Sequence, residues 1–258
     1  VFNQPHNAFQ TASNTSSSAP NTIGDFFGTV PTSTQIISTF GSVGSISPVN
    51  TAGPYAALGG RQKFVEHEST LPRDRVFLNY SYFDNVPLSQ DGNSVNRFTP
   101  GVEKTFFDGM ASVTVRVPMW TTLSSDIYTG TSPSDENYEF GNINIGAKLL
   151  LAQTDTFAMS IGTTVRLPTA DDIRLFAENT GVEVARYENQ SVHVIPYLGM
   201  IFTPTDRLFS QVIFQLDFDT NGNPVKILNN GGSLEQVGRA NDANFAYVSW
   251  SAGYWLIK

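Results

Sequence analysis

The chain of 258 residues contains no cysteine, which excludes a disulfide framework, thiol chemistry and a cysteine-ligated zinc. Charge is also scarce, because only 15% of the residues are charged, against about 25% in an ordinary soluble domain. Basic residues are the rarer sign, 15 against 23 acidic residues, and this balance argues against a nucleic-acid partner. No apolar run approaches the ~18 residues that a membrane-spanning helix needs, so we expect no such helix.

Residues 1–60 form a block rich in Ser, Thr, Asn, Gly and Pro, in which Asp25 is the only charged residue. The block shows no sustained hydrophobic period, and it lacks the charge of a solvated disordered tail. We therefore predict an irregular, extended segment that acts as a plug or an arm, with a flexible linker as the alternative. Residues 61–258 are the second predicted unit.

From about Arg75 onward the chain falls into runs that alternate between apolar and polar residues, which is typical of β-strands. In residues 141–151, for example, Ile143 and Ile145 alternate with Asn142 and Asn144. Eight such runs predict eight strands: 75–84, 95–107, 110–117, 141–151, 155–167, 191–203, 206–218 and 244–258. No convincing amphipathic helix appears, although residues 171–178 are compatible with a short one in a loop.

The connections between these runs alternate between short and long. Asp108-Gly109 predicts a tight hairpin with a type I′ turn, because this pair accepts the positive φ that the turn requires. Residues 152–154 and 204–205 are further short connections. Long polar connections occupy residues 85–94, 118–137, 168–190 and 219–243.

Tight turns at one end, long loops at the other and one apolar face per strand predict a transmembrane antiparallel up-and-down β-barrel. The apolar faces carry no charged residue in mid-strand, whereas the opposite faces carry Ser, Thr, Asn, Gly and Gln. A soluble ligand-binding barrel or sandwich, the alternative, would have apolar residues inside and dense charge outside. Pro100 and Pro196 stand inside strand runs, where we expect β-bulges.

Two stretches resemble a known family: ESTLPRDRVFLNYSYF at 68–83 and VNRFTPGVEKTFFDG at 95–109. They are similar to outer-membrane barrels abundant in planctomycete-type bacteria, related to transporters assigned to phenol degradation by the MetA pathway. The resemblance covers roughly residues 60–258. It implies an outer-membrane location in a Gram-negative-type bacterium, a barrel fold and a channel role, with no known substrate. It also implies about 12 strands in the full protein, so that the eight strands here would be a carboxyl-terminally incomplete barrel.

If the apolar faces meet lipid, a set of charged residues lines the lumen. We predict that Arg97, Arg116 and Arg166 lie near the long-loop end. The remaining four are predicted near the short-turn end: Arg75, Glu103, Lys148 and Arg207. One interpretation is a lumen with basic mouths that attracts anionic solutes. The alternative is structural, with arginines that pair with carboxylates and brace the wall.

Two further motifs bear on chemistry. Asp217, Asp219 and Asn221 resemble the start of an EF-hand loop, which makes a surface Ca²⁺ a candidate ligand, yet Leu228 replaces the bidentate acid at the twelfth position. The alternative is an Asp/Asn-Gly loop turn. His193 and Ser191 share a face, but residues two apart on a strand are poorly placed as a base and a nucleophile. We therefore predict no enzymatic activity and no other cofactor.

The predicted function is an outer-membrane channel for passive diffusion of small polar solutes. The alternative is a structural barrel that anchors or organises a surface or periplasmic assembly, with residues 1–60 as the docking arm. Expected partners are outer-membrane lipid and polar solutes, in a homo-oligomer or a larger outer-membrane assembly. Interfacial girdles are predicted from aromatic residues near the strand ends: Phe106, Phe107, Tyr138, Phe140, Phe202, Phe209, Tyr247, Tyr254 and Trp255.

Overall fold

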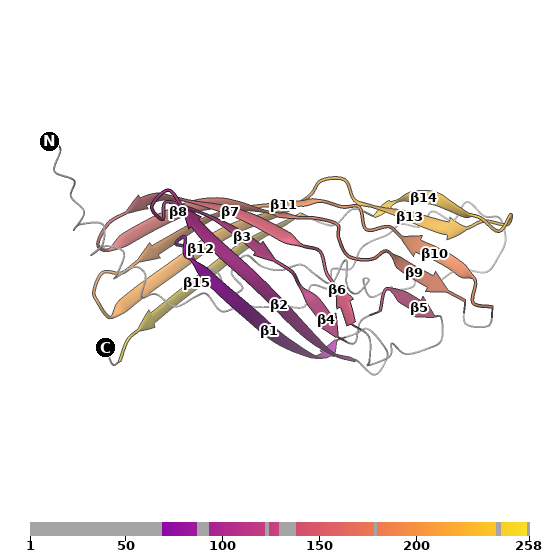
Figure 1. The fold of residues 1–258 in the computed structure, drawn as a ribbon, viewed down its shortest axis with the longest axis horizontal. Helices are drawn as coiled ribbons and strands as arrows, with labels where there is room; N and C mark the ends of the chain where they lie inside the picture. Colours follow the sequence, from indigo (N-terminus) through magenta and orange to yellow (C-terminus); the bar gives the residue numbers. More distant parts are fainter. Residues whose placement is uncertain are drawn as a thin grey trace.

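The computed structural model describes residues 69–86, 93–121, 124–128, 138–177, 180–240 and 244–256, and every regular element in these ranges is a β-strand (Figure 1). The predicted all-β class is therefore confirmed. No helix that is long and apolar enough to cross a membrane occurs in the described ranges. The predicted segment 1–60 lies outside them, as do residues 61–68 of the second predicted unit.

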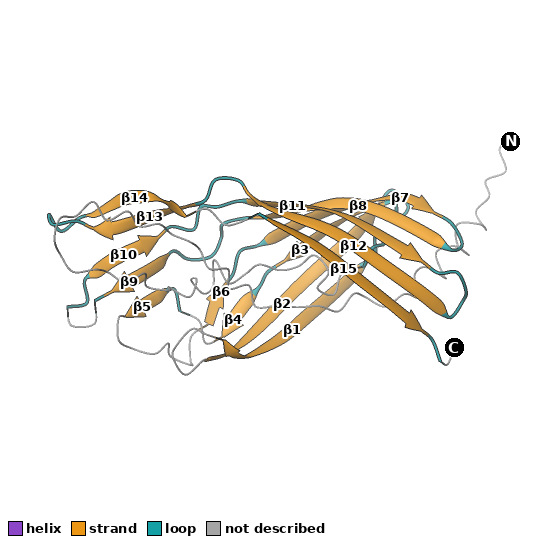
Figure 2. Cartoon of the chain, turned by 180° about the vertical axis from the view of Figure 1, so that it is seen from behind, coloured by secondary structure: helices purple, strands orange, loops and turns teal. Residues whose placement is uncertain are grey.

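The larger sheet is a meander of eight long strands that pair antiparallel with their neighbours in chain order. These strands are the eight that the sequence predicts: β1 (Arg75–Val86), β2 (Asn93–Phe106), β3 (Ala111–Arg116), β7 (Asn144–Gln153), β8 (Phe157–Arg166), β11 (His193–Phe202), β12 (Leu208–Asp219) and β15 (Phe245–Tyr254). The sheet curls into a half-barrel (Figure 2). Its edges, β1 and β15, each pair with one neighbour, and no pairing between them occurs among the described residues.

Two short strands, β4 (Met119–Thr121) and β6 (Tyr138–Phe140), extend this sheet beside β2. The break between β3 and β4 falls opposite Pro100, whose carbonyl oxygen accepts a hydrogen bond from the Val117 N–H at 3.1 Å. At Pro196 the ladder between β11 and β12 omits two residue pairs and resumes in the same register. The predicted bulges at both prolines are therefore absent, because a gap in a neighbouring ladder accommodates each missing N–H.

The predicted tight hairpin is confirmed between β2 and β3. Asp108 and Gly109 have φ values of 54° and 83°, and the Met110 N–H donates to the Phe107 carbonyl oxygen at 3.1 Å. Phe107 also has a positive φ, of 52°, and the last register pair is Phe106 with Ala111, so the connection is a four-residue turn and not the predicted two-residue type I′ turn.

The long connections differ from the expectation of irregular loops, because they build a second sheet. This five-stranded sheet has the order β14-β13-β10-β9-β5. Its strands are β5 (Asp126–Tyr128), β9 (Ile173–Phe176), β10 (Glu183–Tyr187), β13 (Asn223–Leu228) and β14 (Leu234–Ala240). β9 with β10 and β13 with β14 are antiparallel hairpins within one connection each. β10 with β13 and β5 with β9 join different connections, and β5 with β9 is the parallel pair of this sheet. The short helix predicted at 171–178 is wrong, because β9 occupies its centre.

The two faces of the curled sheet differ sharply in chemistry. On the outer face large apolar side chains are exposed, including Val76, Leu78, Ile161, Phe214, Val248 and Trp250. Asp84 and Lys104 are the charged residues in outward alternation among the described residues of the eight long strands, and each lies near a strand end. The inner face, around which the sheet curls, buries polar side chains such as Asn79, Thr99, Ser112, Ser160, Gln211 and Gln215.

Candidate functional site

Several charged side chains lie on the inner face, where the strand register places residues of neighbouring strands side by side. Arg116, Asn144, Arg166 and His193 are register partners on four consecutive strands, β3, β7, β8 and β11, and all four are buried. The predicted face is correct for Arg97, Glu103 and Lys148 as well as for Arg116 and Arg166.

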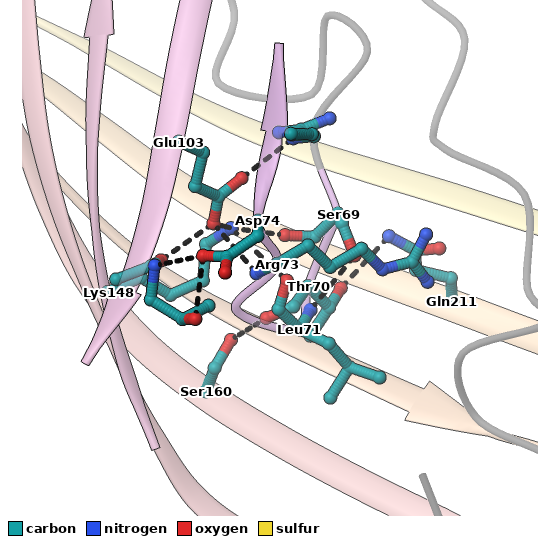
Figure 3. Close-up of polar contacts among 12 residues, drawn as sticks. Ser69, Thr70, Leu71, Arg73, Asp74, Glu103, Lys148, Ser160 and Gln211 are labelled. Atoms are coloured by element: carbon teal, nitrogen blue, oxygen red, sulfur yellow. Dashed lines mark hydrogen bonds and ion pairs between the residues drawn. The ribbon is translucent and has the colours of Figure 1, made fainter. Parts of the chain in front are cut away.

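The segment that precedes β1 lies across this inner face, and we call residues Ser69–Asp74 the strap (Figure 3). The Ser160 Oγ–H donates to the Thr70 carbonyl oxygen at 2.5 Å, and the Gln211 Nε2–H donates to Thr70 Oγ1 at 2.9 Å. Thr70 is completely buried. The strap is thus bonded to β8 and β12 at positions well inside both strands.

A glycine in the wall makes the approach of the strap possible. Gly199 of β11 lies under Thr70, and a Cβ at Gly199 would stand only 2.8 Å from Thr70 Cγ2. Real Cβ atoms essentially never approach a heavy atom so closely. The absence of a side chain at this position therefore shapes the seat of the strap.

Lys148 of β7 provides the third wall contact of the strap. Its Nζ donates to the Ser69 carbonyl oxygen at 2.7 Å and lies 3.5 Å from that of Leu71. The same ammonium is 3.0 Å from Glu103 Oε1, and the side chains are 2% and 0% exposed. A buried ammonium needs such a set of acceptors, because an unpaired charge away from water is costly.

Glu103 of β2 connects this cluster to the start of β1. Its Oε2 accepts from Arg75 Nε at 2.7 Å, its Oε1 accepts from Ser112 Oγ at 2.6 Å, and the Arg73 N–H donates to Oε1 at 3.3 Å. The structure therefore joins Arg75, Glu103 and Lys148, which the sequence places at the same short-turn end. At these residues the bracing interpretation of the inward charges is correct.

A second brace lies near the long-loop end. Asp217 Oδ1 is 2.8 Å from His193 Nδ1, and Asp217 Oδ2 is 3.9 Å from Arg166 Nη2. Arg97 lies over aromatic rings, with its guanidinium carbon 5.1 Å from the ring centre of Phe83 and 5.2 Å from that of Trp120. Such cation–π contacts help to hold a guanidinium in place.

Arg207 does not join the other predicted lumen residues. It lies in the turn between β11 and β12, one residue before β12 begins, and it is exposed. Alternation would place it on the inner face, but the strand pattern does not extend into the turn.

On the inner face, aromatic rings lie over the glycines that are their register partners on the neighbouring strand. A Cβ at Gly101 would stand 2.4 Å from the Phe77 ring, and one at Gly253 would stand 2.5 Å from the Phe209 ring. Phe209 therefore packs inward and is 8% exposed, which corrects its predicted place in an aromatic girdle. Tyr247 also alternates inward. The remaining predicted girdle residues are exposed near strand ends or in the adjoining turn: Phe106, Phe107, Tyr138, Phe140, Phe202, Tyr254 and Trp255.

The candidate calcium ligands form hydrogen bonds with different groups of the protein. Asp217 contacts His193, whereas Asp219 Oδ1 accepts from the N–H groups of Asn221 and Gly222 at 3.1 and 2.8 Å and from Ser191 Oγ. Asp219 thus closes a turn, as the alternative interpretation states. In the described part of the chain no group of three or more His, Cys, Asp or Glu residues is placed to hold a metal ion.

Ser191 and His193 hydrogen-bond to two different carboxylates, Asp219 and Asp217.

The sequence did not predict a role for the strap residues Ser69–Leu71, because a short uncharged stretch has no periodicity that predicts a contact.

No protein-family model matches the chain, and a search of curated proteins finds no significant match.

Proposed function

We propose that this chain forms the wall of a transmembrane β-barrel in an outer membrane, and that its lumen lets small polar solutes diffuse passively. One observation carries the proposal: the outer face of the curled sheet is apolar and nearly free of charge, whereas the inner face holds the buried charged side chains and many polar ones. An apolar cluster of Leu71, Ala158, Ile201 and Phe209 interrupts the inner face beside the strap. A soluble barrel needs the reverse arrangement, because its outer face meets water and its inner face forms the core. Exposure of the apolar side chains of Val248 and Trp250 is energetically favourable where they contact lipid.

Membrane insertion requires closure of the sheet, because lipid offers no partner for the N–H and C=O groups of an open edge. The edges β1 and β15 run in opposite directions, since the meander contains an even number of long strands. An antiparallel contact between β1 and β15, or an even number of strands between them, therefore closes the barrel.

Hydroxyl, amide and charged groups occupy inward positions on each of the strands β1, β2, β3, β7, β8 and β12, and this supports transport of polar solutes.

The second candidate is a structural role at the membrane surface. It is favoured by the five-stranded sheet, which extends from the long-loop end of the curled sheet (Figure 1). Such a sheet presents an edge strand, β14, to which a partner strand can pair.

Conductance in a planar lipid bilayer tests the channel proposal. The full chain, purified in detergent, should produce discrete current steps, and detergent without protein should produce none. A salt gradient across the bilayer then gives the ion preference from the reversal potential. Extraction without detergent would contradict the membrane location. The absence of current steps, both in the native chain and in the variants described in the next subsection that release the strap, would instead favour the structural role.

A further inference from the structure

We propose that the strap is the constriction of the lumen, and that Lys148 is the residue that holds it there. This inference rests on the proposed channel function. It assigns a role in solute size selection to Ser69–Leu71, which lie on the inner face and belong to neither sheet.

The position of the strap is the first argument. Its contacts come from β7, β8, β11 and β12, four consecutive strands of the wall. Ser160 and Gln211 are each the fourth residue of their strands, so the strap lies inside the curl rather than at its rim. A chain segment at this depth takes up cross-section that a solute would otherwise use.

The construction of the seat is the second argument. The side chains that bond the strap are themselves buried, with Lys148, Ser160 and Gln211 at 4%, 0% and 1% exposure. Two of them bond backbone carbonyl oxygens, and Gly199 leaves room for Thr70. Leu71 adds an apolar contact, because its buried side chain packs with Ala158, Ile201 and Phe209. Buried donors matched to strap acceptors, a glycine under Thr70 and this apolar contact indicate a fixed seat.

Lys148 is the decisive anchor because one ammonium reaches both the Ser69 and Leu71 carbonyl oxygens. A methionine at this position keeps the apolar stem but cannot donate a hydrogen bond. Glu103 then keeps its bonds to Arg75 and Ser112. Lys148→Met is therefore expected to loosen the strap, and its combination with Thr70→Gly and Ser160→Ala to release it, because the combination also removes the bonds from Ser160 and Gln211.

The test compares unit conductance in planar bilayers and the largest sugar that enters proteoliposomes, using the full chain. Lys148→Met should raise the unit conductance and shift the size limit to larger sugars. Lys226→Met is the matched control, because Lys226 pairs with Glu188 in the five-stranded sheet, away from the strap. The control should leave both readouts at the native value. Thr70→Gly with Ser160→Ala is a second route to release, for use if Lys148→Met does not fold.

A disulfide provides a reversible lock. A Cβ at position 199 would lie 3.4 Å from the Thr70 Cβ. This spacing is close to the ~3.5–4.5 Å typical between the Cβ atoms of a disulfide. The chain has no other cysteine, so Thr70→Cys with Gly199→Cys creates one defined pair. In the Lys148→Met background, an added oxidant should return conductance and size limit to the native values, and a reductant should raise both again.

Each outcome decides the proposal. An increase with Lys148→Met that the lock reverses supports the constriction. A conducting native protein whose conductance and size limit do not change when Lys148→Met is combined with Thr70→Gly and Ser160→Ala overturns the constriction and leaves the channel standing. An increase that the lock does not reverse assigns the effect to the wall and also overturns the constriction. Absence of current in the native, released and locked proteins overturns both the channel and the constriction.

Discussion

The ring of Tyr197 lies over Gly162, its register partner on the neighbouring strand, so closely that a Cβ on Gly162 would stand 2.2 Å from the tyrosine hydroxyl oxygen. The same Cβ would be 2.4 Å from the Ala147 carbonyl oxygen, which belongs to the backbone of β7. An aromatic ring that covers a glycine in this way protects the exposed backbone and pins the strand register. The pair thus connects three strands, β7, β8 and β11.

Gly162→Ala is expected to destabilise the protein, because neither the ring nor the backbone oxygen can move freely away from the new methyl group. Overpacking of this kind costs about 1–3 kcal/mol. Urea unfolding in detergent, followed by tryptophan fluorescence, measures the change. Gly238→Ala in β14 is the control, because a Cβ there meets nothing within 4 Å. Equal stability of the two variants would contradict the packing argument.

Glu103→Gln should weaken the fold strongly, because it removes the negative charge that pairs with the buried Lys148 ammonium. Breaking a buried ion pair from one side costs about 3–5 kcal/mol. The same urea titration gives the free energy of unfolding.

Asp126→Asn is the matched comparison for Glu103→Gln, because Asp126 pairs with Arg174 at 2.8 Å with both side chains more than one-third exposed. Exposed pairs contribute about 0–1 kcal/mol, so its loss should be much smaller. A larger effect of Asp126→Asn would show that the buried cluster is not the stronger brace.

The outer face can be tested by placing a charge in its middle. Ile161, in the middle of β8, is 45% exposed, and Ile161→Arg should cost about 2–4 kcal/mol of stability in a bilayer, as arginine does at the midplane of a membrane barrel. Leu208→Arg is matched in exposure but lies at the first residue of β12, where the cost should be about 0–1 kcal/mol. Folding into lipid vesicles, measured by urea titration, separates the two. Equal folding of both variants would contradict a lipid-facing outer surface.

We expect the stability to depend on pH because of the hydrogen bonds that the carboxylate of Asp74, at the end of the strap, accepts. Its carboxylate accepts hydrogen bonds from Lys104 Nζ, the Thr105 N–H and Thr105 Oγ1, which hold the pKa of Asp74 well below its ordinary value of 3.8. A carboxyl whose pKa falls on folding stabilises the fold at pH values above its unfolded pKa. This contribution is lost as pH falls from about 3.8 toward the lower folded pKa.

The measurement compares the native chain with Asp74→Asn in urea titrations from pH 7 to pH 3. The native advantage should be constant at neutral pH and should shrink below about pH 4, where the unfolded Asp74 takes up its proton. An advantage that grows with falling pH would contradict the assigned hydrogen bonds.

The eight long strands were predictable because each contains a run with a period of two, and that period directly reports which residues share a face. The inward places of Arg97, Arg116 and Lys148 followed from the same rule. The rule fails where strands end, which is why Arg207 lies in a turn and not on the inner face. It also fails for β9 and β10, which are four and five residues long, because such short segments have too few residues to show a period.

The sequence by itself determined the all-β class, the order of the long strands and the two chemically opposite faces of the sheet, because alternation and turn residues are local properties of the chain. The tertiary structure alone decided three features: the pairing of the long connections into a second sheet, the braces of Glu103 and Asp217, and the seat of the strap. Each depends on residues far apart in the chain, such as Thr70 and Gln211, that meet only when the sheet curls. No local pattern encodes such contacts, since the curvature of the whole sheet sets their geometry.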